Sequence, residues 1–102
     1  MTGRVRVLVY AVAPESGDAA VEEAYHRISR ELRGTPGLLG NELLRSLRDP
    51  RGFVVMSSWE SLDAFGAWEA GSAHRSATAP LRLLQDGARP VRFDLYEVRA
   101  AY

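Results

Sequence analysis

Residues 53–68 constrain the fold most strongly, because they predict a strand that leads almost directly into a helix. The first part of this stretch is apolar and rich in residues that favour β-structure, and Trp59 closes it. Ser61 is a residue type that caps helix N-termini, while Glu60 and Asp63 put negative charge near the positive end of the helix dipole. The sequence therefore predicts a strand and an aromatic-bearing helix that are joined by a serine cap.

Hydrophobic spacing predicts the other elements. Early valines alternate with arginines in residues 4–13, as expected for a strand with one buried face. Apolar side chains between Val21 and Leu32 recur at the spacing of one helical stripe, and Gly34 suits the position just after a helix. In chain order, the expected elements are a strand at 4–13, a helix from 18 that ends before the glycine at 34, strands at 38–47 and 53–59, a helix after 61 that breaks at 71–72, a helical segment from about 72 to 84 and a strand at 90–98.

The predicted order of elements, β-α-β-β-α-β, is that of the ferredoxin-like split βαβ fold. Helical crossovers then put the helices on one face of a four-stranded antiparallel sheet, which makes residues 1–102 one α+β domain. The opposite face carries side chains that are too apolar for water, including Leu8, Tyr10, Val12 and Leu44. Because an exposed apolar face implies a partner, we expect a homodimer that packs sheet against sheet.

Composition narrows the possible partners. The 13 basic and 13 acidic residues cancel, which argues against a nucleic-acid-binding or anionic-membrane-binding protein. The absence of cysteine excludes disulfides, thiol catalysis and thiolate metal sites. No apolar run approaches the roughly 18 residues of a membrane span, so the chain is expected to be cytoplasmic.

Motifs for cofactors are missing from the sequence. The glycines at 34, 37 and 40 flank a turn and do not match the G-x-G-x-x-G pattern of a dinucleotide site. No G-x-S-x-G nucleophile elbow is present, and the two histidines, His26 and His74, are too far apart to suggest a metal site. We therefore expect neither a metal nor a flavin or nicotinamide cofactor.

Three aromatic residues, Trp59, Phe65 and Trp68, lie close together at the predicted junction of strand and helix. They either fill a small core or line an apolar pocket for a flat aromatic ligand, and the sequence alone supports both interpretations. His74 follows the predicted helix break, where a pocket mouth would open. Histidine transfers protons near neutral pH, although a histidine that only caps a helix or lies on the surface is more common.

Several short motifs of the sequence resemble those of the antibiotic biosynthesis monooxygenase family. The resemblance rests on Pro-Gly-Leu-Leu-Gly at 36–40, on Trp-Glu-Ser at 59–61 and on the Ala-Phe pair at 64–65, and it extends over nearly the whole chain. Members of this family are small dimeric α/β barrel proteins that oxidise aromatic compounds with O2. The resemblance implies cofactor-independent oxygenation of a phenolic, anthrone-like or hydroquinone metabolite, in secondary metabolism.

The resemblance also implies site residues. Trp59 matches the pocket tryptophan of members that oxidise anthrones, and Arg82 takes the place of their arginine. Val55 occupies the position of their asparagine, and Phe65 occupies that of one tyrosine. The position of their other tyrosine falls near Leu43, so most of the polar side chains of their pocket are missing here. In members that degrade haem, the haem-ligand histidine falls near the threonine at 78, and haem degradation is not expected.

These observations leave three hypotheses. In a monooxygenase, His74 or Tyr10 would act as the base, Arg82 would stabilise the phenolate, and Trp59, Phe65 and Trp68 would shape the pocket. In a non-catalytic dimer, the same pocket would only bind a small aromatic molecule. In a polyketide cyclase or isomerase, His74 would be essential and O2 would not be consumed.

Overall fold

The computed structural model describes residues 3–71, 73–91 and 93–102, but not the side chains of residues 73–77. The described chain has the predicted order of elements, and the second helical region is divided in two. The elements are β1 (Val5–Val12), α1 (Ala19–Leu32), β2 (Leu38–Arg45), β3 (Gly52–Trp59), α2 (Leu62–Ala70), α3 (Ala73–Arg82) and β4 (Phe93–Glu97).

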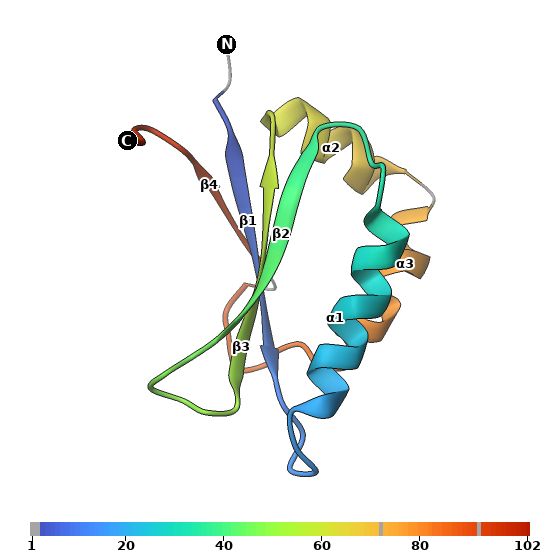
Figure 1. Ribbon diagram of the computed structural model, residues 1–102, viewed down its shortest axis with the longest axis vertical. Helices are drawn as coiled ribbons and strands as arrows, with labels where there is room; N and C mark the ends of the chain where they lie inside the picture. Colours follow the sequence, from blue (N-terminus) through green and yellow to red (C-terminus); the bar gives the residue numbers. More distant parts are fainter. Residues whose placement is uncertain (1–2, 72, 92) are drawn as a thin grey trace.

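The four strands form one antiparallel sheet in the order β2-β3-β1-β4. The helices α1, α2 and α3 all lie on the same side of this sheet (Figure 1). This arrangement confirms the predicted ferredoxin-like α+β fold. None of the helices in the described ranges is long and apolar enough to cross a membrane.

Alternation along β1 gives the sheet two different faces. Val5 and Val7 are only 3% exposed beneath the helices, as the valine pattern predicts. Leu8 pairs directly with Met56, and Tyr10 pairs with Val54. Since directly paired residues share one face, these side chains lie on the side away from the helices. We call the helix-covered side the helix face and the other the open face, which is formed mainly by Arg6, Leu8, Tyr10, Val12, Glu42, Leu44, Val54, Met56, Ser58, Asp94 and Tyr96.

The helix face holds two adjoining groups of buried side chains. One group lies under α1, where Val21, Ile28 and Leu32 pack against residues of the sheet that include Phe53. The stripe predicted for this helix is therefore its buried side, except that Tyr25 is only partly buried. The second group lies under α2 and contains Val5, Val7, Trp59 and Phe65.

The junction between β3 and α2 follows the predicted chemistry. The Ser61 hydroxyl accepts a hydrogen bond from the backbone N–H of Ala64 at 3.1 Å, so Ser61 is the N-cap of α2. Gly37 lies against the first turn of this helix, where an added Cβ would collide with the Ala64 side chain. The Gly37 carbonyl also accepts a hydrogen bond from the Glu60 N–H at 2.8 Å. A glycine at residue 37 thus lets the turn before β2 dock on the start of α2.

Several boundaries differ from the prediction, and two of the differences have a clear local cause. β2 ends at Arg45 and not at Leu47, because the Ser46 hydroxyl accepts hydrogen bonds from two backbone N–H groups of the following turn and bends the chain there. Leu47 is consequently 93% exposed. β4 begins at Phe93 and not at 90, since Pro90 has no N–H to donate to the sheet.

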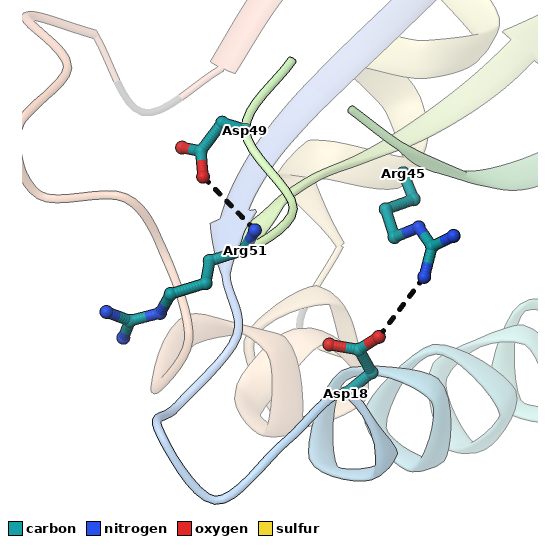
Figure 2. A network of polar contacts seen from close by, with 4 residues as sticks. All are labelled: Asp18, Arg45, Asp49 and Arg51. Carbon is teal, nitrogen blue, oxygen red and sulfur yellow. Dashed lines mark hydrogen bonds and ion pairs between the residues drawn. The ribbon is translucent and has the colours of Figure 1, made fainter. Parts of the chain in front are cut away.

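Polar contacts hold the turns at the end of the sheet near the start of α1 (Figure 2). Asp49 accepts a hydrogen bond from the Arg51 N–H at 3.1 Å, and the Arg51 guanidinium donates to the Ala13 carbonyl at 2.9 and 3.0 Å. Asp18 occupies the N-cap position of α1, as predicted, but its side chain makes no capping hydrogen bond. Its carboxylate instead lies 3.5 Å from the Arg45 guanidinium on β2.

Candidate functional site

A pocket lies on the helix face, between the sheet and the two later helices. Its volume is about 160 Å³, and its walls come from β1, β3, α2, α3 and β4. The apolar part of the wall is formed by Val7, Val9, Trp59, Phe65, Trp68, Leu81 and Phe93. We call this cavity the aromatic pocket.

The aromatic residues of the pocket contact one another directly. The ring centroids of Trp59 and Phe65 are 5.5 Å apart at an interplanar angle of 73°, and those of Trp59 and Trp68 are 5.4 Å apart at 34°. Phe93 from β4 extends the cluster, with its centroid 6.2 Å from that of Phe65. Edge-to-face and tilted contacts of this kind are favourable and hold large side chains in fixed positions. The pocket therefore has a preformed aromatic wall.

A hydrogen bond fixes the indole at the centre of this wall. The Trp59 Nε1–H donates to the Ser57 Oγ at 2.9 Å, and Trp59 is only 1% exposed. Ser57 precedes Trp59 by two residues in β3, so both side chains lie on the helix face. Ser57 thereby brings a hydroxyl group into a wall that is otherwise apolar.

The remaining polar lining comes mainly from the helices. Glu69 belongs to α2, Thr78 and Arg82 belong to α3, and Gln85 follows α3. A few polar groups in an apolar cavity are what orients a small ligand in most binding sites. The pocket thus combines a flat aromatic wall with carboxylate, hydroxyl, guanidinium and amide groups.

The structure brings together four of the residues proposed from the sequence. Trp59, Phe65, Trp68 and Arg82 all line the aromatic pocket. Sequence reasoning missed Ser57, although its two-residue spacing from Trp59 already assigns both to one face of the strand. Phe93 and the lining residues of β1 were also missed as site residues, because their place in the pocket depends on strand order.

Val55 and Leu43, which the family resemblance suggested, do not line the aromatic pocket. Val55 is 9% exposed and packs in the core beneath α1, with Phe53 and Ile28. It shares the helix face with Trp59, but each pair of residues advances a strand by roughly 6.6 Å, which carries Val55 away from the pocket. Leu43 pairs directly with Val55 and lies beside this same core.

Tyr10 lies on the open face and therefore does not line the aromatic pocket. Its hydroxyl donates a hydrogen bond to Asp94 Oδ2 at 2.6 Å, and the Arg89 guanidinium lies 3.6 Å from its ring centroid. The hydrogen bond to Asp94 raises the pKa of Tyr10 above its ordinary value, and burial adds to the shift. Since a tyrosine accepts a proton only after losing its own, a raised pKa makes Tyr10 a poorer base near neutral pH.

His74 is part of α3, but its side chain lies outside the described residues. Its proposed role as a base therefore stays a prediction. Within the described ranges, no group of three or more histidine, aspartate or glutamate residues is arranged to hold a metal ion.

Comparison with known proteins assigns the family. The sequence model of the antibiotic biosynthesis monooxygenase family matches residues 4–80. The chain belongs to this family. Its monooxygenase-family fold is the scaffold that forms the aromatic pocket.

Similar proteins agree with this assignment. Protein SchA of Streptomyces halstedii is 30% identical over 92 residues, which are 90% of this chain but only 24% of SchA, so the chain spans about a quarter of that relative. A mycobilin-producing heme oxygenase of Mycobacterium tuberculosis is 32% identical over 60 residues, or 59% of this chain and 57% of that enzyme.

A solved structure shares the fold. It is a mutant form of SnoaB, a cofactor-independent oxygenase from Streptomyces nogalater. It superimposes with a TM-score of 0.79 at 20% identity and covers 96% of this chain and 95% of that chain. At this identity the match supports the fold alone.

Proposed function

We propose that this protein is a cofactor-independent monooxygenase that oxidises a phenolic, anthrone-like or hydroquinone metabolite of secondary metabolism with O2. The observation that carries the proposal is the aromatic pocket, in which Trp59, Phe65 and Trp68 form a flat wall beside the polar groups of α3. Membership in the monooxygenase family supports the same activity.

The chemistry asks little of the protein, because an electron-rich phenolate can itself reduce O2. For a phenol with a free ortho or para position, one oxygen atom of O2 forms a new bond to that carbon and the O–O bond breaks. The hydrogens of that C–H and of the phenolic O–H leave with the second oxygen atom as water. One phenol and one O2 thus give one quinone and one water, and the ring supplies the electrons.

The pocket residues would perform the tasks that remain. The aromatic wall holds the ring flat and excludes water from it, which favours one productive orientation. The Arg82 guanidinium offers positive charge to the phenolate, and such charge stabilises the developing anion most strongly in a site shielded from water. The position of each side chain in the lining supports these roles.

His74 is our proposed base, on the grounds of its spacing along α3. It precedes Thr78 by four residues and Arg82 by eight, and both of those residues line the pocket. Residues four apart share one face of a helix. Replacing His74 with alanine should lower turnover, and unchanged turnover would remove His74 from the mechanism.

We also propose that a second copy of the chain covers the open face. Leu44 and Tyr96 are 40% and 57% exposed there, and Leu8 and Met56 lie between them on the central strands. Apolar patches of this kind mark interaction sites, and packing sheet against sheet would bury them.

Two other functions use the same pocket without O2. The resemblance led us to expect tyrosine hydroxyls and an asparagine amide in the site. Phe65 takes one of these positions in the pocket, and Val55 and Leu43 take the others outside it. The loss of these polar groups favours a module that binds a ligand without changing it. A cyclase or isomerase remains the other alternative. Haem degradation is less suited to a cavity of about 160 Å³, because a haem is far larger than a single aromatic ring.

Oxygen uptake tests the proposal directly. Purified protein without added cofactor would be given anthrones, naphthols and hydroquinones, and Trp59→Phe would be compared with wild type and with Leu47→Ala as the matched control on the exposed turn. Uptake should exceed autoxidation in wild type and in the control, and fall about tenfold in Trp59→Phe, which loses both the hydrogen bond to Ser57 and part of the wall. Absence of uptake with every compound that binds would favour the binding module or the cyclase.

A further inference from the structure

We propose that the aromatic pocket selects a compact phenolic substrate with a single aromatic ring, and that the Ser57 hydroxyl donates the hydrogen bond that orients the oxygen of this ring. The inference deepens the proposed function and rests on it, because it concerns the same pocket. It narrows the substrate class to simple phenols and hydroquinones, and it adds a specificity-determining residue.

The first argument is size. The pocket has a volume of about 160 Å³. A protein cavity of about 150 Å³ accommodates benzene, which is one aromatic ring. The three fused rings of an anthrone would therefore extend beyond the cavity, and much of their apolar surface would stay unburied.

The walls cannot easily make room for a larger ring system. Trp59, Phe65 and Leu81 are 1%, 4% and 5% exposed, so each is packed on its far side by other parts of the core. Protein interiors are packed about as densely as organic crystals and do not expand without cost. These three side chains therefore form an inner wall that does not yield easily to a larger ring system.

The second argument concerns the hydrogen-bonding capacity of Ser57. A serine hydroxyl has one hydrogen to donate and two lone pairs to accept with. The indole N–H of Trp59 occupies one lone pair at 2.9 Å. In the part of the chain that the structure describes, the Ser57 hydroxyl has no acceptor for its own hydrogen, so the donor is available to a ligand.

The bond from the indole also makes Ser57 a better donor. A hydroxyl that accepts a hydrogen bond is polarised and donates more strongly, especially in a medium of low polarity. Because Trp59 is buried and fixed by its aromatic neighbours, it also restrains the direction of the Ser57 hydroxyl. Ser57 is thus a preoriented donor in an apolar wall.

The positions of the polar groups indicate which ring positions of the ligand carry oxygen. Ser57 comes from the sheet, whereas Thr78 and Arg82 come from α3 on the helical side of the pocket. A ring that carries two oxygens para to one another offers one to each side. A hydroquinone is therefore the class that uses both sets of groups.

Anaerobic titration calorimetry tests this inference separately from the reaction, because no ligand is oxidised without O2. The ligands are hydroquinone, 1,4-dihydroxynaphthalene and anthrone, with p-xylene as the analogue of hydroquinone that lacks oxygen. We expect hydroquinone to bind more tightly than anthrone, although a larger ring system normally gains more from burial.

Variants of two adjacent serines isolate the hydrogen bond. Ser57→Ala should weaken hydroquinone binding about tenfold and leave p-xylene binding unchanged, while Ser57→Thr should restore most of the affinity. Ser58→Ala is the matched control, since Ser58 pairs with Arg6 on the open face and should have no effect. Unchanged binding of p-xylene by Ser57→Ala also shows that its loss of hydroquinone binding does not come from misfolding.

The inference is overturned if anthrone binds as tightly as hydroquinone, if none of the ligands binds, or if Ser57→Ala binds hydroquinone like the wild type. Failure of this inference can be distinguished from failure of the proposed function. Hydroquinone that binds in the predicted pattern but consumes no O2 would refute the oxygenase alone. Anthrone that binds more tightly and is oxidised would refute the single-ring limit alone.

Discussion

The two faces of the sheet are built from the same strands but have opposite properties. On the helix face, Val7 and Trp59 are at most 3% exposed, and a small cavity remains between them and the helices. On the open face, Leu44 and Tyr96 are 40% and 57% exposed. The helix face is completed by the chain itself, whereas the open face leaves apolar surface in contact with solvent.

Polar groups are also used differently on the two faces. On the open face, Tyr10 donates to Asp94 and lies beneath the Arg89 guanidinium, so its hydroxyl already has a partner within the chain. On the helix face, Ser57 accepts from Trp59 and keeps its own hydrogen for a ligand. Of these two hydroxyl groups, only that of Ser57 lies beside the aromatic pocket and has a hydrogen to donate to a ligand.

The largest expected effect tests the difference in packing. Phe65→Ala should lower the free energy of unfolding by about 3–5 kcal/mol, because it removes a large side chain that is 4% exposed in the aromatic cluster. Leu8→Ala on the open face should cost less at low protein concentration, and its cost should grow with concentration if a second copy covers Leu8. Urea denaturation at several protein concentrations measures the loss of unfolding free energy in both variants. Equal losses in the two variants at every protein concentration would contradict the difference in packing between the two faces.

The next effect tests the open face as an interface. Met56→Lys puts a charge at its centre, opposite Glu42 on β2, which can pair with the lysine in a single chain. We expect self-association to weaken at least about a hundredfold while the chain stays folded, because an unmatched charge in an interface costs several kcal/mol. Sedimentation equilibrium measures this. Leu47→Lys, at a residue 93% exposed, is the control, and an unchanged mass for Met56→Lys would exclude this face as the interface.

A smaller effect sharpens how the helix face is held together. Ser61→Ala removes the hydroxyl that caps α2 and should cost about 1 kcal/mol of unfolding free energy. Ser16→Ala, on the exposed turn after β1, should cost close to nothing. Thermal or urea unfolding gives both values, and equal stabilities would show that the cap does not support the helix that carries Phe65 and Trp68.

The smallest effect concerns pH and the open face. The pKa of Tyr10 is raised in the folded chain by the hydrogen bond to Asp94, so the protonated phenol is the stabilising form. Its contribution should be fully present below the unfolded pKa, which is about 10, and should be lost as the pH rises through the higher folded value. The difference in unfolding free energy between wild type and Tyr10→Phe should thus be constant from about pH 7 to about pH 9 and shrink above about pH 10.

Urea denaturation across this pH range checks that expectation. Tyr102→Phe is the control, because Tyr102 is exposed at the end of the described chain. A difference that stays the same at all pH values would mean that the contact with Asp94 does not stabilise the folded state.

Local patterns in the sequence predicted much of the fold. The alternation of residues 4–13 identified the buried side of β1, and the serine cap correctly joined β3 to α2. Trp59, Phe65 and Trp68 were found as a group because the strand and helix that carry them are adjacent in sequence. Such features depend only on residues that lie close together in the sequence.

The other site residues were missed or misplaced for different reasons. Ser57 was missed because only the structure reveals its bond to Trp59. Tyr10 was proposed as a base although the period of two in β1 already assigned it to the open face with Leu8. Val55 was taken from a family pattern that does not fix which part of the helix face lies beside the cavity.

The most direct test of the central claim is a product analysis in heavy-isotope O2. Wild-type protein without added cofactor would be mixed with hydroquinone, and the products would be analysed by mass spectrometry against a protein-free sample. We predict one labelled oxygen atom in the hydroxylated quinone and the other in water, at a rate above autoxidation that falls in Trp59→Phe. Quinone without the label, or formation no faster than in the protein-free sample, would contradict the assignment of the aromatic pocket as the site of a cofactor-independent monooxygenase.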